Sequence, residues 1–254
     1  MDNPKSILIT GASSGIGEAL ALEYAAPGTH LFLSGRDRER TDTIAEACRT
    51  KGATAEGKVI DVRDQDAMTD WINACHATKP LDLVIANAGI GLGFNKDVDI
   101  EKHTADIFAV NVNGVFHTIH PSLDLMRKKG HGQIAIMASL AAYHGMPSSP
   151  AYSTSKACVK AYGEALRGAY WSDGIKVTVI CPGFVESRIT RRNKFPMPFL
   201  MTGEKAARII RRGLARNKAR ITFPWQIRLM FGGAVRFLPE FLMDRFLRAL
   251  PDKT

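Results

Sequence analysis

Short apolar stretches alternate along the chain with longer stretches in which apolar residues recur at helical spacing. Helices are expected between the apolar stretches, including a long helical region over about 100–129 and a helix at about 202–217. Strand–helix alternation is typical of a parallel sheet covered by helices on both faces, so we predict a doubly wound α/β fold. The predicted strands are "SILIT" (6–10), "HLFLS" (30–34), "GKVID" (57–61), "LDLVIA" (81–86), "QIAIMAS" (133–139), "IKVTVIC" (175–181) and "ARITFP" (219–224).

The pattern continues without an interdomain linker, an internal repeat or a low-complexity tract. A length of 254 residues suits one α/β domain, so we expect a single domain over 1–254 whose last thirty residues are helical and amphipathic. No signal peptide is visible, and no apolar run approaches the roughly 20 residues that span a bilayer. The four cysteines form no CxxC pair. We therefore expect a cytoplasmic protein with reduced thiols.

Charge is distributed unevenly along the chain. Residues 184–254 hold 16 Lys and Arg against 5 Asp and Glu, whereas residues 1–183 hold 18 against 20. A basic end on a neutral body favours an anionic partner for that end. Two interpretations of the basic amphipathic segment 224–254 remain open: it packs on its own domain or a second subunit, or it lies peripherally on the inner face of a membrane. No nucleic-acid motif accompanies the charge, so we expect no nucleic-acid partner.

A glycine-rich stretch, "TGASSGIG" (10–17), follows the first predicted strand and opens a helix. Gly11 permits a tight turn, Gly15 lets the backbone approach a pyrophosphate, and Gly17 lets helix and strand pack closely. The backbone N–H groups at the helix start then face the anion. In this context the stretch predicts a dinucleotide-binding turn.

A tyrosine and a lysine stand one helical turn apart in "AYSTSKACVK" (151–160), thirteen residues after the serine that ends the fifth predicted strand. An i, i+4 pair lies on one helix face. The ammonium of Lys156 close to the phenol of Tyr152 favours the phenolate and lowers the pKa of that tyrosine. Such a phenol exchanges protons near neutral pH, as general acid–base catalysis requires. With Ser139, this pair forms the candidate reacting group.

These motifs, in this order, resemble the short-chain dehydrogenases/reductases. The resemblance covers residues 5–190, and it implies a doubly wound Rossmann-like sheet in the order 3-2-1-4-5-6-7, followed by a substrate lid over 184–217. It rests on TGASSGIG, Asp61-Val62 after the third strand, Asn87-Ala88-Gly89 after the fourth, Asn111, Ser139, Tyr152-x-x-x-Lys156 and Pro182-Gly183 after the sixth.

The resemblance implies a role for each matching residue. Tyr152 would be the general acid or base, Lys156 would lower its pKa and hold the nicotinamide ribose, and Ser139 would bind the substrate oxygen. Asn111 would bind a water that links Lys156 to solvent, with Asn113 as a rival on sequence alone. No His/Cys/Asp cluster has metal-ligand spacing, so no metal is predicted. The implied cofactor-binding residues are Gly11, Ser13, Ser14, Gly15, Ile16, Gly17, Arg36, Asp61, Val62, Asn87, Ala88, Gly89, Tyr152, Lys156, Pro182, Gly183 and Val185.

The second predicted strand leads into "SGRDRER" (34–40), in which position 35 is glycine. An NAD-binding site would have an acidic residue at this strand end to bind the ribose 2′-OH. Arg36 instead suits a 2′-phosphate by charge and by its forked geometry. We therefore predict a preference for NADP over NAD. The alternative is that Arg36 is one of several solvated charges at a helix start.

The predicted function is that of an oxidoreductase interconverting a carbonyl and a secondary alcohol. Apolar residues in 140–146 and 184–201, among them Tyr143, Phe184, Phe195, Met197 and Phe199, favour a lipophilic substrate. A non-catalytic dinucleotide-binding sensor or scaffold is the alternative, although such a protein needs no phenol. The resemblance also implies a homo-oligomer, a dimer through the long helices or a tetramer.

Overall fold

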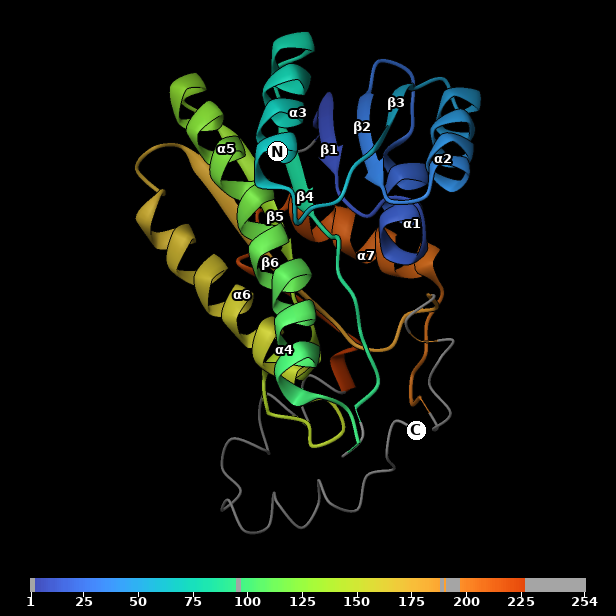
Figure 1. Ribbon diagram of the computed structural model, residues 1–254. Helices are drawn as coiled ribbons and strands as arrows, with labels where there is room; N and C mark the ends of the chain where they lie inside the picture. The colour runs from blue at the N-terminus through green and yellow to red at the C-terminus, as the bar shows by residue number, and fades with distance from the viewer. Residues whose placement is uncertain (1–2, 95–96, 188–189, 191–196, 227–254) are drawn as a thin grey trace.

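The computed structural model describes residues 3–94, 97–187, 190 and 197–226. Its centre is one parallel sheet in the order β3-β2-β1-β4-β5-β6-β7, as predicted (Figure 1). All seven predicted strands are present. Their bounds are β1 (Ser6–Ile9), β2 (His30–Gly35), β3 (Thr54–Val59), β4 (Leu83–Ala86), β5 (Gly132–Met137), β6 (Ile175–Pro182) and β7 (Arg220–Phe223).

Helices cover both faces of the sheet (Figure 1). One face carries α1 (Gly15–Tyr24), α2 (Arg38–Thr50) and α7 (Gly203–Ala215). The other carries α3 (Gln65–Thr78), α4 (Ile100–Phe108), α5 (Gly114–Lys129) and α6 (Pro150–Ala169). A π-helical turn, η1 (Ala109–Asn113), joins α4 to α5, and a 3₁₀ turn, η2 (Leu140–Ala142), lies between β5 and α6. No helix in the described part of the chain is both long and apolar enough to cross a membrane.

The core consists of two apolar layers, one on each face of the sheet. Successive strand side chains point to opposite faces, so Ile7 and Ile9 pack in the α1–α2–α7 layer and Leu8 packs in the other. Both faces are buried, which explains why the central strands are continuously apolar.

All seven strands differ from their predicted bounds by one or more residues, and two of these differences affect the position of a site residue. β3 begins at Thr54 and ends at Val59, because it is the exposed edge strand and lacks the apolar pattern of the central strands. β5 ends at Met137, because the hydroxyl of Ser139 accepts a hydrogen bond from the N–H of Ala141 and thereby begins η2. Asp61 and Ser139 therefore lie just beyond their strands. The predicted amphipathic segment at the C-terminus, 224–254, lies outside the described residues from position 227 onward.

Candidate active site

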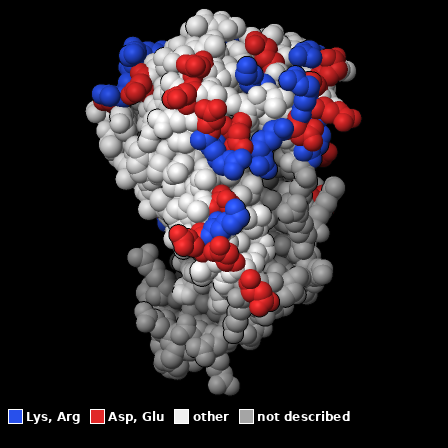
Figure 2. All heavy atoms as spheres, viewed as in Figure 1, with Lys and Arg blue, Asp and Glu red and all other residues white. Residues whose placement is uncertain are grey.

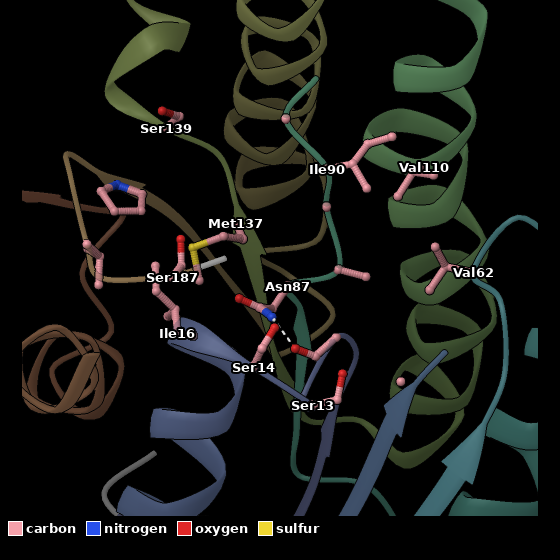
Figure 3. Close-up of a pocket in the computed structure, with 18 of the residues that line it drawn as sticks. Ser13, Ser14, Ile16, Val62, Asn87, Ile90, Val110, Met137, Ser139 and Ser187 are labelled. Atoms are coloured by element: carbon pink, nitrogen blue, oxygen red, sulfur yellow. Dashed lines mark hydrogen bonds between the residues drawn. The ribbon is translucent and has the colours of Figure 1, made fainter. Parts of the chain in front are cut away.

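A cleft of about 530 Å³ lies at the carboxyl edge of the sheet, where the segments after β1, β2, β4, β5 and β6 meet (Figure 3). Ligands of doubly wound folds bind at this edge. Most of the predicted site residues line the cleft: Gly11, Ser13, Ser14, Gly15, Ile16, Arg36, Asp61, Val62, Asn87, Ala88, Gly89, Ser139, Tyr152, Lys156, Pro182, Gly183 and Val185.

The glycine turn has a backbone that other residues would strain. Gly11 and Gly15 have φ of 65° and 60°, and a Cβ added to Gly11 would lie 2.8 Å from the Cα of Ala88. Ser14 is the N-cap of α1, yet its side chain makes no capping hydrogen bond. The first amides of α1 are thus free of a side-chain cap beside the cleft, an arrangement that fits a pyrophosphate.

Gly17 is not among the residues that line the cleft, and its predicted contact with the cofactor stays a prediction. A Cβ on Gly17 would lie 2.6 Å from Nδ2 of Asn87, which shows that the residue serves close packing of α1 against the turn. The same Nδ2 donates to the carbonyls of Thr10 at 3.0 Å and Gly11 at 3.1 Å. Asn87 therefore holds the turn in place from the end of β4 (Figure 3).

The three predicted reacting side chains converge on the cleft. Ser139 hydrogen-bonds to the phenol of Tyr152, which lies in the first turn of α6. Lys156 is buried one turn later; its Nζ donates to the carbonyl of Met137 at 2.9 Å and lies 5.8 Å from the centroid of the Tyr152 ring. Spacing on α6 and the end of β5 together fix this geometry.

The pKa of the phenol differs from the sequence-based prediction. Burial raises the pKa of Tyr152, and the hydrogen bond from Ser139 only partly opposes this effect. Burial also lowers the pKa of Lys156 to about 8. The ammonium is itself desolvated and lies beside the ring, so these residues by themselves do not produce the lowered phenol pKa that was predicted.

Asn111 lies behind the cleft rather than in its wall. It belongs to the η1 turn and is fully buried. Its Oδ1 accepts from the N–H of Ile90 at 2.8 Å, and its Nδ2 donates to the carbonyl of Ile90 at 3.0 Å and to Oγ of Ser155 at 3.1 Å. Both polar atoms of the side chain are therefore hydrogen-bonded within the protein, and the implied water-binding role of Asn111 stays a prediction. The rival, Asn113, is exposed.

Arg40 is a cleft residue that the sequence interpretation missed. Its Nη2 pairs with Asp37 at 2.7 Å, while its Nε is buried without a hydrogen-bond partner. Arg40 lies in the first turn of α2, and the run of charged residues at 36–40 was the available signal. Asp61 pairs with Arg63 at 2.7 Å, and the hydrogen bond from that guanidinium lowers the pKa of the carboxyl.

The two segments that are expected to flank the substrate, 140–146 and 184–201, contribute differently to the cleft. Ser187 and Thr190, absent from the predicted set, line the cleft after β6, and their hydroxyls lie 3.2 Å apart. Tyr143 points to β7 instead, where its hydroxyl lies 3.2 Å from Oγ1 of Thr222. Lys160 Nζ and Arg220 Cζ lie 5.2 and 5.8 Å from its ring centroid.

The predicted substrate lid also contains Met201 and Phe195. Met201 is buried in the core and pairs through its backbone with Val185. Phe195 lies outside the described residues. Within the described ranges, no three His, Cys, Asp or Glu side chains are grouped so that they could hold a metal ion.

Comparisons with known proteins identify the family of this chain. The model of the short chain dehydrogenase family matches residues 5–196. An uncharacterized oxidoreductase of Myxococcus xanthus is 36% identical over 247 residues, covering 97% of each chain. Gluconate 5-dehydrogenase of Gluconobacter oxydans is 31% identical over 186 residues, or 73% of each chain. The structure of a 3-ketoacyl-ACP reductase from Sinorhizobium meliloti 1021 is similar with a TM-score of 0.77 at 27% identity, over 88% of this chain and 99% of that one. The chain belongs to the short-chain dehydrogenase family of oxidoreductases.

Proposed function

We propose that the protein is an NADP-preferring oxidoreductase that interconverts a carbonyl and a secondary alcohol. The observation that carries this proposal is the convergence of Ser139, Tyr152 and Lys156 on a cleft that also contains the glycine turn. A nicotinamide dinucleotide, when bound, supplies or accepts the hydride. Gluconate 5-dehydrogenase, a relative by sequence, supports the alcohol–carbonyl class.

The chain's own residues handle the proton. Burial keeps the phenol of Tyr152 protonated at neutral pH, so it is ready to donate its proton to a carbonyl oxygen as that oxygen gains charge. Ser139 hydrogen-bonds to the same phenol, and this contact supports a role for Ser139 in binding the substrate oxygen. The pKa of about 8 keeps Lys156 largely protonated at neutral pH, which stabilises negative charge on the phenolate after transfer.

The preference for NADP rests on the end of β2. Arg36 and Arg40 both line the cleft, and the unpartnered Nε of Arg40 supplies a further donor. Gly35 stands where a fold that selects NAD has an acidic side chain; a Cβ there would lie 2.5 Å from Oγ1 of Thr41 and 2.8 Å from Cβ of Ser13. Positive charge and lack of room both favour a 2′-phosphate over a 2′-hydroxyl.

A lipophilic substrate fits the apolar wall. Ile90 and Leu92 supply apolar surface in the lining of the cleft. We also infer a single domain, because both apolar layers pack on one sheet.

A homo-oligomer fits the outer surface of α5 and α6, where Phe116, His120 and Tyr162 stack together at a partly exposed position.

The test is a screen of ketones, aldehydes and alcohols with NADPH, NADH, NADP and NAD, followed by absorbance of the reduced nicotinamide. We expect turnover with apolar carbonyls and NADPH. Tyr152→Phe separates an enzyme from a dinucleotide-binding sensor, because it should keep NADPH affinity and lower turnover by about 10²–10⁴-fold. Unchanged turnover in Tyr152→Phe would refute the assigned role, and tight NADPH binding without any turnover in the wild type would favour the sensor.

A further inference from the structure

The stretch from α7 to β7 is strongly basic. Residues 203–223 contain seven Lys and Arg and one acidic residue, Glu204. Arg211 pairs with Glu23, and Arg220 pairs with Glu164. The other five cations are exposed and form no ion pair with any described residue; they are named the α7 ridge and are Lys205, Arg208, Arg212, Arg216 and Lys218.

The ridge faces away from the protein. Residues 205, 208, 212 and 216 follow one another at intervals of three or four, so their side chains share one face of α7 and its C-terminal cap. The opposite face is buried against α1 and the sheet through Ala206, Ala207, Ile210 and Leu214. With a rise of about 1.5 Å per residue, these four cations extend over about 17 Å.

This distribution differs from the surface over α3 to α6. Figure 2 shows that face with lysines and arginines lying among aspartates and glutamates. Along the α7 ridge the one acidic residue of the helix is Glu204, beside Lys205, and no ion pair with a described residue neutralises the five cations. A second copy of the chain packed through α7 would bring two like-charged ridges together, which electrostatic repulsion disfavours. The ridge therefore fits a partner that is itself anionic.

Large apolar side chains are exposed next to both ends of the α7–β7 stretch. Phe199 and Leu200, which are 53% and 43% exposed, come just before α7, and Trp225, 66% exposed, follows β7. The start of α7 and the end of β7 both lie at the carboxyl edge of the sheet, since Gly203 packs near Gly15 and Phe223 bonds to Gly183. Exposed tryptophan and aliphatic groups beside unpaired cations suit the headgroup and acyl boundary of a bilayer better than a nucleic-acid backbone.

We propose that the α7 ridge docks on an anionic lipid bilayer, with Phe199, Leu200 and Trp225 entering the headgroup region. Anionic headgroups supply the counter-charges that the protein lacks along α7. The cleft opens at the same edge as these apolar side chains, so its mouth lies near the membrane surface when the ridge is docked. The docking does not depend on the proposed activity, and its test needs no substrate.

The test uses the full chain in sedimentation with vesicles of phosphatidylcholine alone or mixed with phosphatidylglycerol, at low and high salt. We expect binding to the mixed vesicles that weakens with salt. Each cation near an anionic surface contributes about fivefold in affinity, so Arg208→Glu/Arg212→Glu should weaken binding by roughly 25-fold or more. Lys205→Ala/Arg216→Ala gives a milder second test should the charge reversal unfold the protein.

A matched control keeps the net charge change and moves it elsewhere. Lys58 on β3 and Lys128 on α5 are exposed and form no ion pair with described residues, so Lys58→Glu/Lys128→Glu should bind nearly as the wild type does. Trp225→Ser should weaken vesicle binding without changing its salt dependence. Three results would overturn the proposal: no binding of the wild type to mixed vesicles, an equal loss in the control variant, or tighter ridge-dependent binding to duplex DNA or RNA than to vesicles.

Discussion

Replacement of Asn111 by leucine, a side chain of similar size, should destabilise the fold even though Asn111 lies at a predicted catalytic position. The change removes the partners of both backbone groups of Ile90, which Asn111 holds at 2.8 and 3.0 Å. Ser155 keeps its bond to the carbonyl of Tyr152 at 2.8 Å and loses little. An unsatisfied buried backbone group costs about 1–3 kcal/mol, and Ile90 is only half-buried, so we expect a total loss of about 2–4 kcal/mol.

Urea unfolding provides the assay, and Asn113→Leu provides the control. Asn113 is exposed in the same η1 turn, so its replacement should change the free energy of unfolding by less than about 0.5 kcal/mol. The Asn111→Leu midpoint should fall by about 1 M urea relative to the control. Because Ile90 lines the cleft, NADPH affinity should fall as well. Equal midpoints for the two variants would refute the bracing role of Asn111.

Three further predictions concern the cleft and its support. Arg36→Ala and Arg40→Ala should each weaken NADP more than tenfold relative to NAD in fluorescence titrations; equal weakening of both cofactors would contradict the assigned preference. Burial lowers the pKa of Lys156 from 10.5 to about 8, so between these pH values the unfolded chain binds more protons and the folded state gains stability as pH rises. The unfolding free energy of the wild type relative to Lys156→Met should therefore increase over that pH window. A difference that stays constant over the window would exclude the pKa shift. Tyr143→Leu should lower turnover without changing NADPH affinity, because the turn that carries Ser139 loses its anchor on β7. Tyr143→Phe keeps the ring and should lose less turnover. A fall in NADPH affinity in place of turnover would contradict this role.

Local patterns predicted much of this molecule. The strand order and the helices between strands were expected from the alternation of apolar stretches and from the family resemblance, and the structure confirms them. The glycine turn and the Tyr152–Lys156 pair could be identified because their geometry depends on neighbours within one helical turn. Exposed β3 was misplaced because an edge strand does not need buried side chains on both faces.

Long-range contacts explain the features of the site that local sequence patterns did not predict. Asn111 is held by Ile90, 21 residues earlier, and no local pattern signals that its amide is used up in this way. The phenol pKa of Tyr152 depends on burial by several segments, which spacing alone does not reveal. Ser187 lines the cleft beside Gly15, a residue that is far from it in the sequence, and no local pattern signals this proximity.

The close contacts around Gly35 limit how the cofactor preference of this protein can evolve. An aspartate there, the residue by which related folds select NAD, would collide with Ser13 and Thr41 before it could serve any ribose. A lineage drifting toward the other cofactor would first have to reduce one of those neighbours, and that intermediate gains nothing by itself. The route therefore requires at least two changes, of which the first is neutral at best. Directed evolution from this scaffold should find its early cofactor variants at positions 36 and 40 rather than at 35.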